Sequence, residues 1–316
     1  MNRSTHTKKT ELSRRQFICA GAATMGSALL TNFSVGATQN PARTPTISTV
    51  DLGALKLFQG AGCNVIALHG DDGALMIDGG LRANADMLLK AVKDATGSNR
   101  VHTLINTHWH PEQVGANEAV GRDGGVIIAH EKTKMYLSNT VSSITFEGRR
   151  PPSPESARPN KTTRGDGSLM FAGQQVNYGY LPAAHTDGDL FVHFPGLNVL
   201  VAGGVVSGEE WPLLDYINGA WLGGRVRAVE RLSEIVNPDT RVVPTNGHVI
   251  TGRDIVRQRD IYDELFQTMI ADMNKGFGPE DAAKQNALNK YASEFGDASN
   301  FLYGAYRSML IAYVPD

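Results

Sequence analysis

The sequence predicts an α+β fold in which two β-sheets are covered by helices. Three observations support this fold class. Glycine is frequent, with 34 residues among 316, which favours short strands joined by tight turns over a helical bundle. The chain contains two successions of strand-like runs, each followed by helical patterns. Strict alternation of strands and helices is absent, so the pattern suggests two sheets with helices outside them.

Composition excludes several classes of protein. An apolar share of 41% over 316 residues is enough for the core of one large domain or two ordinary ones. Two cysteines cannot form the disulfide framework that stabilises small secreted proteins. Thirty basic and 32 acidic residues leave a formal charge of −2 without a basic stripe, which excludes a nucleic-acid partner bound through bulk charge.

Residues 1–37 have the pattern of an export signal. The run Ser13-Arg14-Arg15-Gln16-Phe17-Ile18 matches a twin-arginine signal, and Val35-Gly36-Ala37 offers a cleavage site. The alternative is an N-terminal anchoring helix, but the apolar run is shorter than the ~20 residues that span a bilayer. We therefore expect a periplasmic protein of residues 38–316 with no membrane attachment. Loss of five basic residues and one acidic residue would change its formal charge to −6.

After a linker at 38–48, the first succession of strands begins. Residues 64–68 and 74–78 flank a Gly/Asp turn in the pattern of a hairpin. Apolar residues have helical spacing over 83–95, and buried strands are expected at 101–106 and 126–129. Residues 140–166 are polar, with three prolines inside 151–154, so we expect a long irregular loop there.

The second succession comprises strands predicted at 168–172, 174–181, 189–194 and 198–202. A helix near 221–236 and a strand at 241–244 follow. From Gly252 onward the pattern is helical, with Pro279 opening a second helix and residues 301–311 forming a third. These C-terminal helices either pack on the sheets or pair two subunits. The predicted units are therefore 49–252 and a helical extension at 253–316.

The first chemical motif is His108-Trp109-His110, which follows the strand expected at 101–106. In an extended backbone, residues i and i+2 point the same way, so both imidazoles can face one point. Two histidines at a rigid strand end provide half of a tetrahedral zinc site. Two solvated loop histidines without a function would give the same pattern, so the motif alone leaves both alternatives open.

A third histidine, His185, has the same context, because it follows one predicted strand and precedes another. Asp187 and Asp189 are expected to fix the turn after it through backbone hydrogen bonds. Three histidines let zinc keep a water in its fourth position, where the pKa of that water falls toward ~7. The predicted metal ligands are therefore His108, His110 and His185.

Three motifs together resemble those of the metallo-β-lactamase superfamily in order and spacing. They are Met76-Ile77-Asp78-Gly79-Gly80, Thr107-His108-Trp109-His110-Pro111 and His185-Thr186-Asp187-Gly188-Asp189. The similarity covers about residues 50 to 260. It implies a four-layer αββα sandwich with a metal site at one edge of the paired sheets.

The sequence departs from the family pattern at four positions. The family motif H-x-H-x-D-H ends here in Glu112 and Gln113, in place of an aspartate and a histidine. Gly204 stands where the resemblance places a bridging aspartate, and Asn246 where it places a histidine. All four changes fall on the family's second metal or on the bridge between metals, and neutral amides bind zinc poorly. The resemblance therefore implies one zinc ion per chain.

Three further residues have alternative roles. Glu112 is either the general base for the activated water or a cap of the following helix. Asp78 either orients a ligand histidine from behind or only shapes its turn. His248 reaches the site, as a fourth ligand or proton shuttle, only if the backbone after Pro244 bulges.

The sequence thus predicts an exported hydrolase in which one zinc ion activates water against an ester, lactone or amide of a small molecule. Arg149, Arg150 and Trp211 are candidates for the pocket wall, and the arginines suit a carboxylate substrate. The alternative is a non-catalytic binding or accessory protein on a partly dismantled scaffold.

Overall fold

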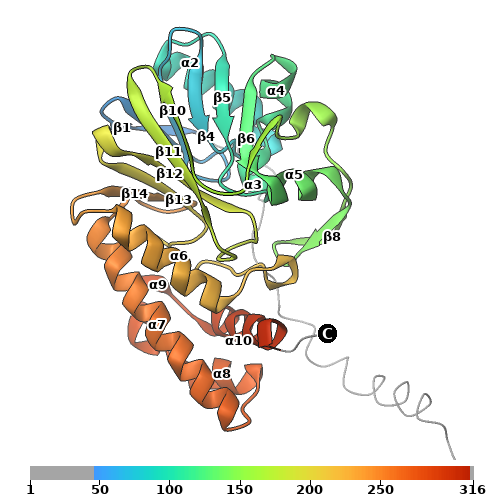
Figure 1. The fold of residues 1–316 in the computed structure, drawn as a ribbon, viewed down its shortest axis with the longest axis vertical. Helices are drawn as coiled ribbons and strands as arrows, with labels where there is room; N and C mark the ends of the chain where they lie inside the picture. Colours follow the sequence, from blue (N-terminus) through green and yellow to red (C-terminus); the bar gives the residue numbers. More distant parts are fainter. Residues whose placement is uncertain (1–45, 314–316) are drawn as a thin grey trace, which may run out of the picture. The chain divides into compact units, whose positions relative to one another are not determined.

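The computed structural model describes residues 46–313, and the structural statements below refer to that part of the chain. The predicted export signal and most of the predicted linker lie in 1–45, outside the described residues. The described chain forms four layers, with two central sheets between two groups of helices (Figure 1). The α+β class and the four-layer sandwich are confirmed.

The first sheet has seven strands in the order β1-β2-β3-β4-β5-β6-β9. Its strands are β1 Ser48–Leu52, β2 Leu55–Gln59, β3 Val65–Leu68, β4 Ala74–Ile77, β5 Val101–Ile105, β6 Val126–His130 and β9 Lys161–Thr163. Pairing is antiparallel from β1 to β4 and parallel from β4 to β9. The predicted hairpin at 64–78 is β3–β4.

The second sheet has six strands in chain order. They are β10 Gly167–Phe171, β11 Gln174–Leu181, β12 Asp189–Phe194, β13 Val199–Gly203, β14 Arg241–Pro244 and β15 Ile250–Thr251. All neighbours pair antiparallel except β13 and β14, which are parallel because α6 crosses over between them.

Helices cover the outer faces of both sheets. The α-helices are α2 Ala85–Thr96, α3 Pro111–Val114, α4 Asn117–Arg122, α5 Glu131–Ser138, α6 Leu222–Ile235, α7 Gly252–Asn274, α8 Pro279–Gln285, α9 Ala292–Phe295 and α10 Ser299–Tyr313. Short 3-10 turns are η1 Arg82–Asn84, η2 Glu155–Ala157, η3 Pro195–Leu197, η4 Tyr216–Asn218 and η5 Asn289–Tyr291.

Side chains that point alternately to the two faces of a sheet divide the core into layers. In β3, Ile66 and Leu68 belong to the cluster between the two sheets, whereas Val65 and Ala67 pack toward Leu88 of α2. Successive side chains of a strand point to opposite faces, so one four-residue strand serves two buried layers. A third cluster joins the outer face of the second sheet to α6, α7 and α10.

The segment 140–166 differs from its prediction as one irregular loop. It contains the hairpin β7 Val141–Ser143 and β8 Phe146–Arg150, then η2, and then β9 at the edge of the first sheet. Most of its strand residues are exposed or half-buried. An exposed hairpin lacks the apolar alternation from which strands are inferred, which explains the difference.

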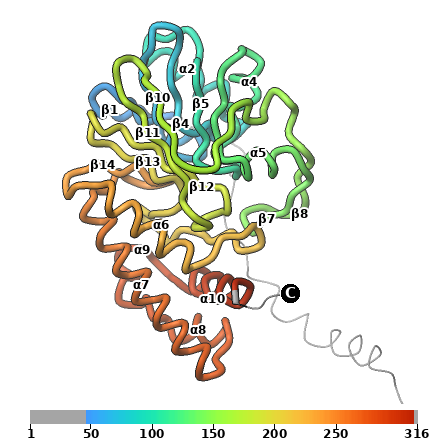
Figure 2. The backbone as a smooth tube through the Cα atoms, viewed as in Figure 1, coloured from blue at the N-terminus to red at the C-terminus, as the bar shows by residue number. Residues whose placement is uncertain are grey.

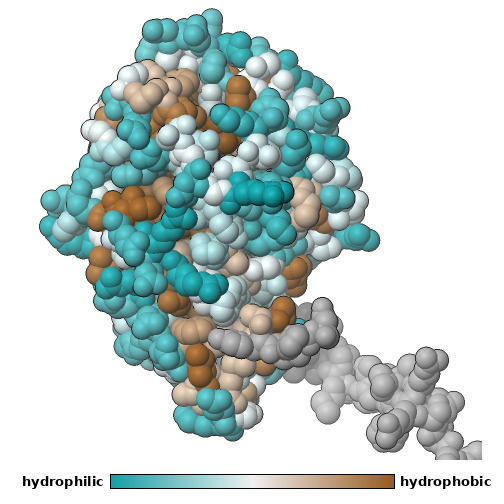
Figure 3. All heavy atoms as spheres, in the orientation of Figure 1, coloured by the Kyte–Doolittle hydropathy of each residue, from teal (hydrophilic) through white to brown (hydrophobic). Residues whose placement is uncertain are grey.

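The C-terminal helices pack on their own chain, on the side of the second sheet that α6 also covers (Figure 2). The first of the two alternatives for these helices therefore holds within the described residues. None of the described helices is both long and apolar enough to span a bilayer. On the face seen in Figure 3, hydrophobic side chains occur in small groups among hydrophilic ones.

Candidate metal centre

Three histidines meet at the ends of central strands. His108 and His110 follow β5, and His185 lies in the loop between β11 and β12. Their candidate ligand nitrogens all lie within 4.8 Å of one another, and the three residues are only 1%, 2% and 7% exposed. The structure therefore brings the three predicted ligands together.

His108 is held by a hydrogen-bonded chain that begins at Asp78. The Thr107 backbone N–H donates to Asp78 Oδ1 and its hydroxyl to Asp78 Oδ2, both at 2.8 Å. Because this hydroxyl already donates to the carboxylate, it accepts from His108 Nδ1 at 3.0 Å. The other ring nitrogen, Nε2, is buried and has no partner among the described residues.

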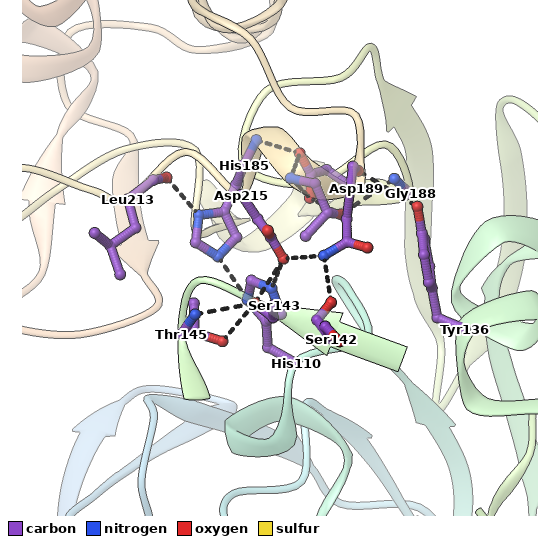
Figure 4. A network of polar contacts seen from close by, with 12 residues as sticks. His110, Tyr136, Ser142, Ser143, Thr145, His185, Gly188, Asp189, Leu213 and Asp215 are labelled. Atoms are coloured by element: carbon purple, nitrogen blue, oxygen red, sulfur yellow. Dashed lines mark hydrogen bonds and ion pairs between the residues drawn. The ribbon is translucent and has the colours of Figure 1, made fainter. Parts of the chain in front are cut away.

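His185 and His110 are each fixed by an oxygen on the loop that precedes η4 (Figure 4). His185 Nδ1 donates to the Leu213 carbonyl at 2.8 Å, and His110 Nε2 donates to Asp215 Oδ2 at 2.9 Å. The remaining nitrogens, His110 Nδ1 and His185 Nε2, face each other at 3.1 Å.

This arrangement fits a metal ion. With one nitrogen of each ring donating to oxygen, neutral imidazoles present a lone pair at His108 Nε2, His110 Nδ1 and His185 Nε2. Two facing lone pairs repel, and a buried acceptor without a donor is costly. A cation between the rings satisfies all three nitrogens, and the oxygens behind the rings are the usual partners of metal-ligating histidines.

Electrostatics favour the neutral form of the His108 and His185 rings. Burial lowers the pKa of His108 well below its ordinary value, and the neighbouring His185 and His110 lower it further. The pKa of His185 is lowered by burial, by His110 and by the Arg225 guanidinium. Neutral imidazole is the form that binds metal, so the site is prepared for a cation.

Asp78 adopts a backbone conformation that is unusual for a residue with a side chain, with φ of +62° at the end of β4. Its carboxyl group is 1% exposed, and burial raises its pKa to about 7, against the opposing hydrogen bonds from Thr107. These contacts match the predicted role in orienting a ligand histidine from behind, because the Thr107 hydroxyl links Asp78 to His108.

Asp189 organises the loop that carries His185. Its Oδ2 accepts from the His185 backbone N–H at 2.6 Å, and Oδ1 accepts from the Thr186 hydroxyl at 2.7 Å. Asp187 instead lies 3.3 Å from Lys132 Nζ. Asp189 therefore fixes the turn as expected, whereas the Asp187 carboxylate forms an ion pair with Lys132.

Asp215 is a site residue that sequence reasoning missed. It is fully buried, and its Oδ2 accepts from His110, from the Ser143 hydroxyl at 2.7 Å and from the Asn218 amide at 2.8 Å. Its partner His110 is 105 positions earlier in the chain. The available signal was a single carboxylate directly after the apolar run 211–214, which indicates a buried acid.

Arg225 of α6 lies behind the same loop. Its guanidinium is fully buried and donates to the carbonyl oxygens of Leu213 at 2.6 Å, Ala184 at 3.2 Å and Pro212 at 3.3 Å. Burial lowers its pKa, and the nearby Tyr262 hydroxyl opposes that change. Helix α6 thus holds both the His185 loop and the loop around Leu213.

Glu112 and Gln113 lie in the short helix α3. Glu112 is half-buried, and its carboxylate makes no hydrogen bond or ion pair with the described residues. Gln113 is 1% exposed and its Nε2 lacks a standard partner, although its side chain lies close enough to Cys63 to affect the thiol. Burial, Asp78 and Glu112 raise the pKa of Cys63, so this buried thiol is not activated.

The two remaining candidates do not meet the imidazoles. Asn246 is exposed and lines a pocket that adjoins His185. His248 is exposed, and its Nδ1 lies 3.4 Å from Glu209 Oε1 rather than beside the other histidines. The backbone after Pro244 therefore does not place His248 in the metal centre.

Gly204 touches the centre directly. A Cβ atom at this position would lie 2.4 Å from His185 Cδ2 and 2.7 Å from His185 Nε2. A Cβ atom does not approach non-bonded atoms this closely, so any side chain at this position requires the imidazole to move. The ring of His185 thus fills the space that a residue with a side chain would need.

Comparison with known proteins assigns the fold. Residues 59–248 match the model of the Metallo-beta-lactamase superfamily. No curated protein matches the sequence.

Two solved structures illustrate the likeness in three dimensions. The metallo-beta-lactamase from Pontibacter korlensis is 20% identical, with a TM-score of 0.56 over 69% of this chain and 99% of that one. The stereoselective inverting sec-alkylsulfatase Pisa1 from Pseudomonas sp. is 15% identical, with a TM-score of 0.61 over 84% of this chain and 50% of that one.

Proposed function

Because the chain belongs to the metallo-beta-lactamase superfamily, we propose that it is an exported hydrolase that uses one zinc ion, bound by His108, His110 and His185. Its substrate is an ester, lactone or amide of a small molecule. The observation that carries the proposal is the convergence of three buried nitrogens whose rings are each fixed by an oxygen from behind. The twin-arginine motif at 13–18 supports export.

Zinc held by three neutral histidines supplies a Lewis acid and an activated water near neutral pH. The contribution of the chain is to keep the ligands neutral, oriented and shielded from solvent. Thr107, Leu213 and Asp215 hold the far nitrogens, so each imidazole keeps the tautomer that presents a lone pair to the ion.

Three features support a single ion. Gly204 has no room for a bridging carboxylate, because the His185 ring occupies that space. Gln113 offers a neutral amide in place of an imidazole, and its Nε2 is a donor that repels cations. Asn246 is exposed and is likewise a neutral amide. None of these three positions offers a second cation a charged ligand, which leaves Glu112 as the one carboxylate of the replaced second-metal positions.

Glu112 is the proposed proton acceptor. Asp78, Asp189 and Asp215 are occupied by hydrogen bonds from Thr107, His185 and His110, whereas the Glu112 carboxylate is uncommitted among the described residues. A half-buried, uncommitted carboxylate one residue beyond the His-x-His motif and its proline is suited to take a proton from water. The capping alternative is supported by the position of Glu112 in the first turn of α3, where a carboxylate is favoured, but no hydrogen bond from the described residues to its carboxylate accompanies it.

Metal content and turnover test the proposal together. The exported protein is purified, loaded with zinc, desalted and analysed for metal, then assayed on phenyl esters, lactones, β-lactams and, because one structural neighbour is a sec-alkylsulfatase, secondary alkyl sulfates. We expect one zinc per chain and turnover of an ester or lactone, both lost in His185→Ala. Two zinc ions per chain would contradict the single site, and one ion without any turnover would favour a binding protein.

A further inference from the structure

A cavity of about 160 Å³ opens beside the metal centre. His185 and Gly204 are among its lining residues, so a molecule inside it contacts the His185 ring. The histidines themselves are almost fully buried, and His185 is the most exposed of the three at 7%. This cavity therefore adjoins the most accessible ligand of the centre.

Its wall has both polar and apolar residues, and the apolar part is held in place by other side chains. Trp211 and Leu213 line it, and Trp211 stacks on Phe301 of α10 with ring centroids 5.4 Å apart and 12° between planes. Leu213 is held by Arg225 and His185 at its carbonyl and is 42% exposed at its side chain. A space of ~150 Å³ is large enough for a molecule the size of benzene. The cavity therefore has room for an apolar group of about six carbons against Trp211 and Leu213.

The charged side chains that line this cavity are carboxylates. Glu209 and Glu210 line the cavity, and no lysine or arginine occurs among its described lining residues. Arg225, which holds the Leu213 carbonyl behind the cavity wall, is itself buried against carbonyl oxygens. His248 is the remaining titratable group beside the carboxylates, 3.4 Å from Glu209.

We propose that this cavity receives a short, uncharged apolar group of the substrate, and that Glu209 and Glu210 discriminate against substrates that carry a carboxylate or sulfate there. The inference rests on the proposed hydrolase function and narrows its substrate class to neutral esters and lactones. It also assigns no carboxylate-binding role to Arg149 and Arg150, because neither lines the cavity.

The first test compares three phenyl esters of equal length on the zinc-loaded protein at pH 8. The acyl groups are hexanoyl, which is neutral, monoadipoyl, which is anionic, and 6-aminohexanoyl, which is cationic. We expect kcat/KM for the hexanoate to exceed that for the adipate about threefold or more at low ionic strength, because two exposed carboxylates repel an anionic group beside them and salt screens this repulsion. Equal values for the two esters would overturn the proposal.

Paired variants assign the effect to the two carboxylates. In Glu209→Gln/Glu210→Gln, the hexanoate-to-adipate ratio should fall toward one. Asp263→Asn/Glu280→Gln removes two exposed carboxylates from α7 and α8 and should leave the ratio as in the parent protein. A ratio that changes equally in both double variants would show only a general effect of net charge and would overturn the assignment.

A binding measurement separates this inference from the proposed function. Saturation-transfer NMR on the protein without added metal detects hexanamide and hexanoate directly, without turnover. Binding of hexanamide but not hexanoate, together with no ester hydrolysis, would retain the pocket and reject the hydrolase. Ester turnover with equal binding of the two ligands, or no binding of hexanamide, would reject the pocket and leave the hydrolase standing.

Discussion

Arg225 and His185 share one acceptor, because the Leu213 carbonyl oxygen lies 2.6 Å from Arg225 Nη2 and 2.8 Å from His185 Nδ1. The guanidinium fixes the position of this carbonyl, and the carbonyl fixes the orientation of the imidazole. A candidate metal ligand is therefore positioned by a helix that follows it by 37 residues in the sequence.

Arg225→Met should weaken zinc binding by about tenfold or more, because partners behind a ligand histidine contribute 10–100-fold to metal affinity. Competition with a chromophoric chelator measures the affinity. Arg227→Met is the matched control, since Arg227 is an exposed residue of the same helix whose guanidinium lies over Trp221. Equal affinities of the two variants would contradict a positioning role for Arg225.

Asp215→Asn should lower zinc affinity by about 10–100-fold. The amide can donate to His110 Nε2, which would place the proton of this ring on Nδ1 and remove the lone pair that faces His185. The d–d absorption of the cobalt-loaded protein reports the loss of a nitrogen ligand. Ser143→Ala removes only one of three donors to Asp215 and should have a smaller effect. An unchanged cobalt spectrum in Asp215→Asn would refute this role.

Gly204→Ala should reduce both stability and zinc affinity, because its Cβ would lie 2.4 Å from the His185 ring. Forced overpacking of this kind costs about 1–3 kcal/mol, which urea unfolding can measure. Gly165→Ala is a suitable control, since a Cβ there meets no atom within 4 Å. Gly204→Asp should likewise fail to recruit a second ion. A gain to two zinc ions in that variant would show that the space can open.

Asp78→Asn should change how stability depends on pH. The pKa of Asp78 rises from 3.8 to about 7 in the folded state, so its contribution favours folding at acid pH and is lost as the pH rises through 7. The variant should therefore gain stability relative to the parent between pH 4 and pH 8, by about 4 kcal/mol at most. Asparagine also tolerates the positive φ of this position.

Urea titrations of the protein without added metal, at several pH values, measure this difference. The lowered pKa values of His108 and His185 act in the opposite direction, with stability lost as the pH falls below about 6.5, but they are common to both proteins. Asp263→Asn changes an exposed carboxylate, so its free energy of unfolding should depend on pH as that of the parent does. A parallel curve for Asp78→Asn would mean that the carboxylate ionises without cost.

The elements that sequence predicted well have a buried face. Residues 174–181 and 189–194 were expected as strands and are β11 and β12, with the same bounds. The hairpin β7–β8 was missed because Phe146–Arg150 is largely exposed, so burial imposes no alternation on its sequence. Contact with the core imposes an apolar pattern on the sequence of a strand. An exposed hairpin has few such contacts, so its sequence does not show that pattern.

The residues of the candidate site also divide into those that the sequence predicts and those that it does not. His108, His110 and His185 could be predicted because each follows a strand end, where parallel and paired strands converge. Asp215 and the Leu213 carbonyl could not, because their contacts depend on how a loop after β13 folds back over residues far earlier in the chain. The position of His248 likewise depended on the backbone path after Pro244, which spacing alone does not fix.

The residues that hold His110 and His185 in place are synthesised after the histidines themselves. His108 and His110 are synthesised within the first 110 of 316 residues, but the loop that fixes His110 and His185 is braced by Arg225 and, through Trp211, by Phe301. The growing polypeptide contains His108 and His110 early. It contains His185 and all the residues that hold the three imidazoles only when translation is nearly complete. Tight capture of an ion is therefore an event of the finished chain.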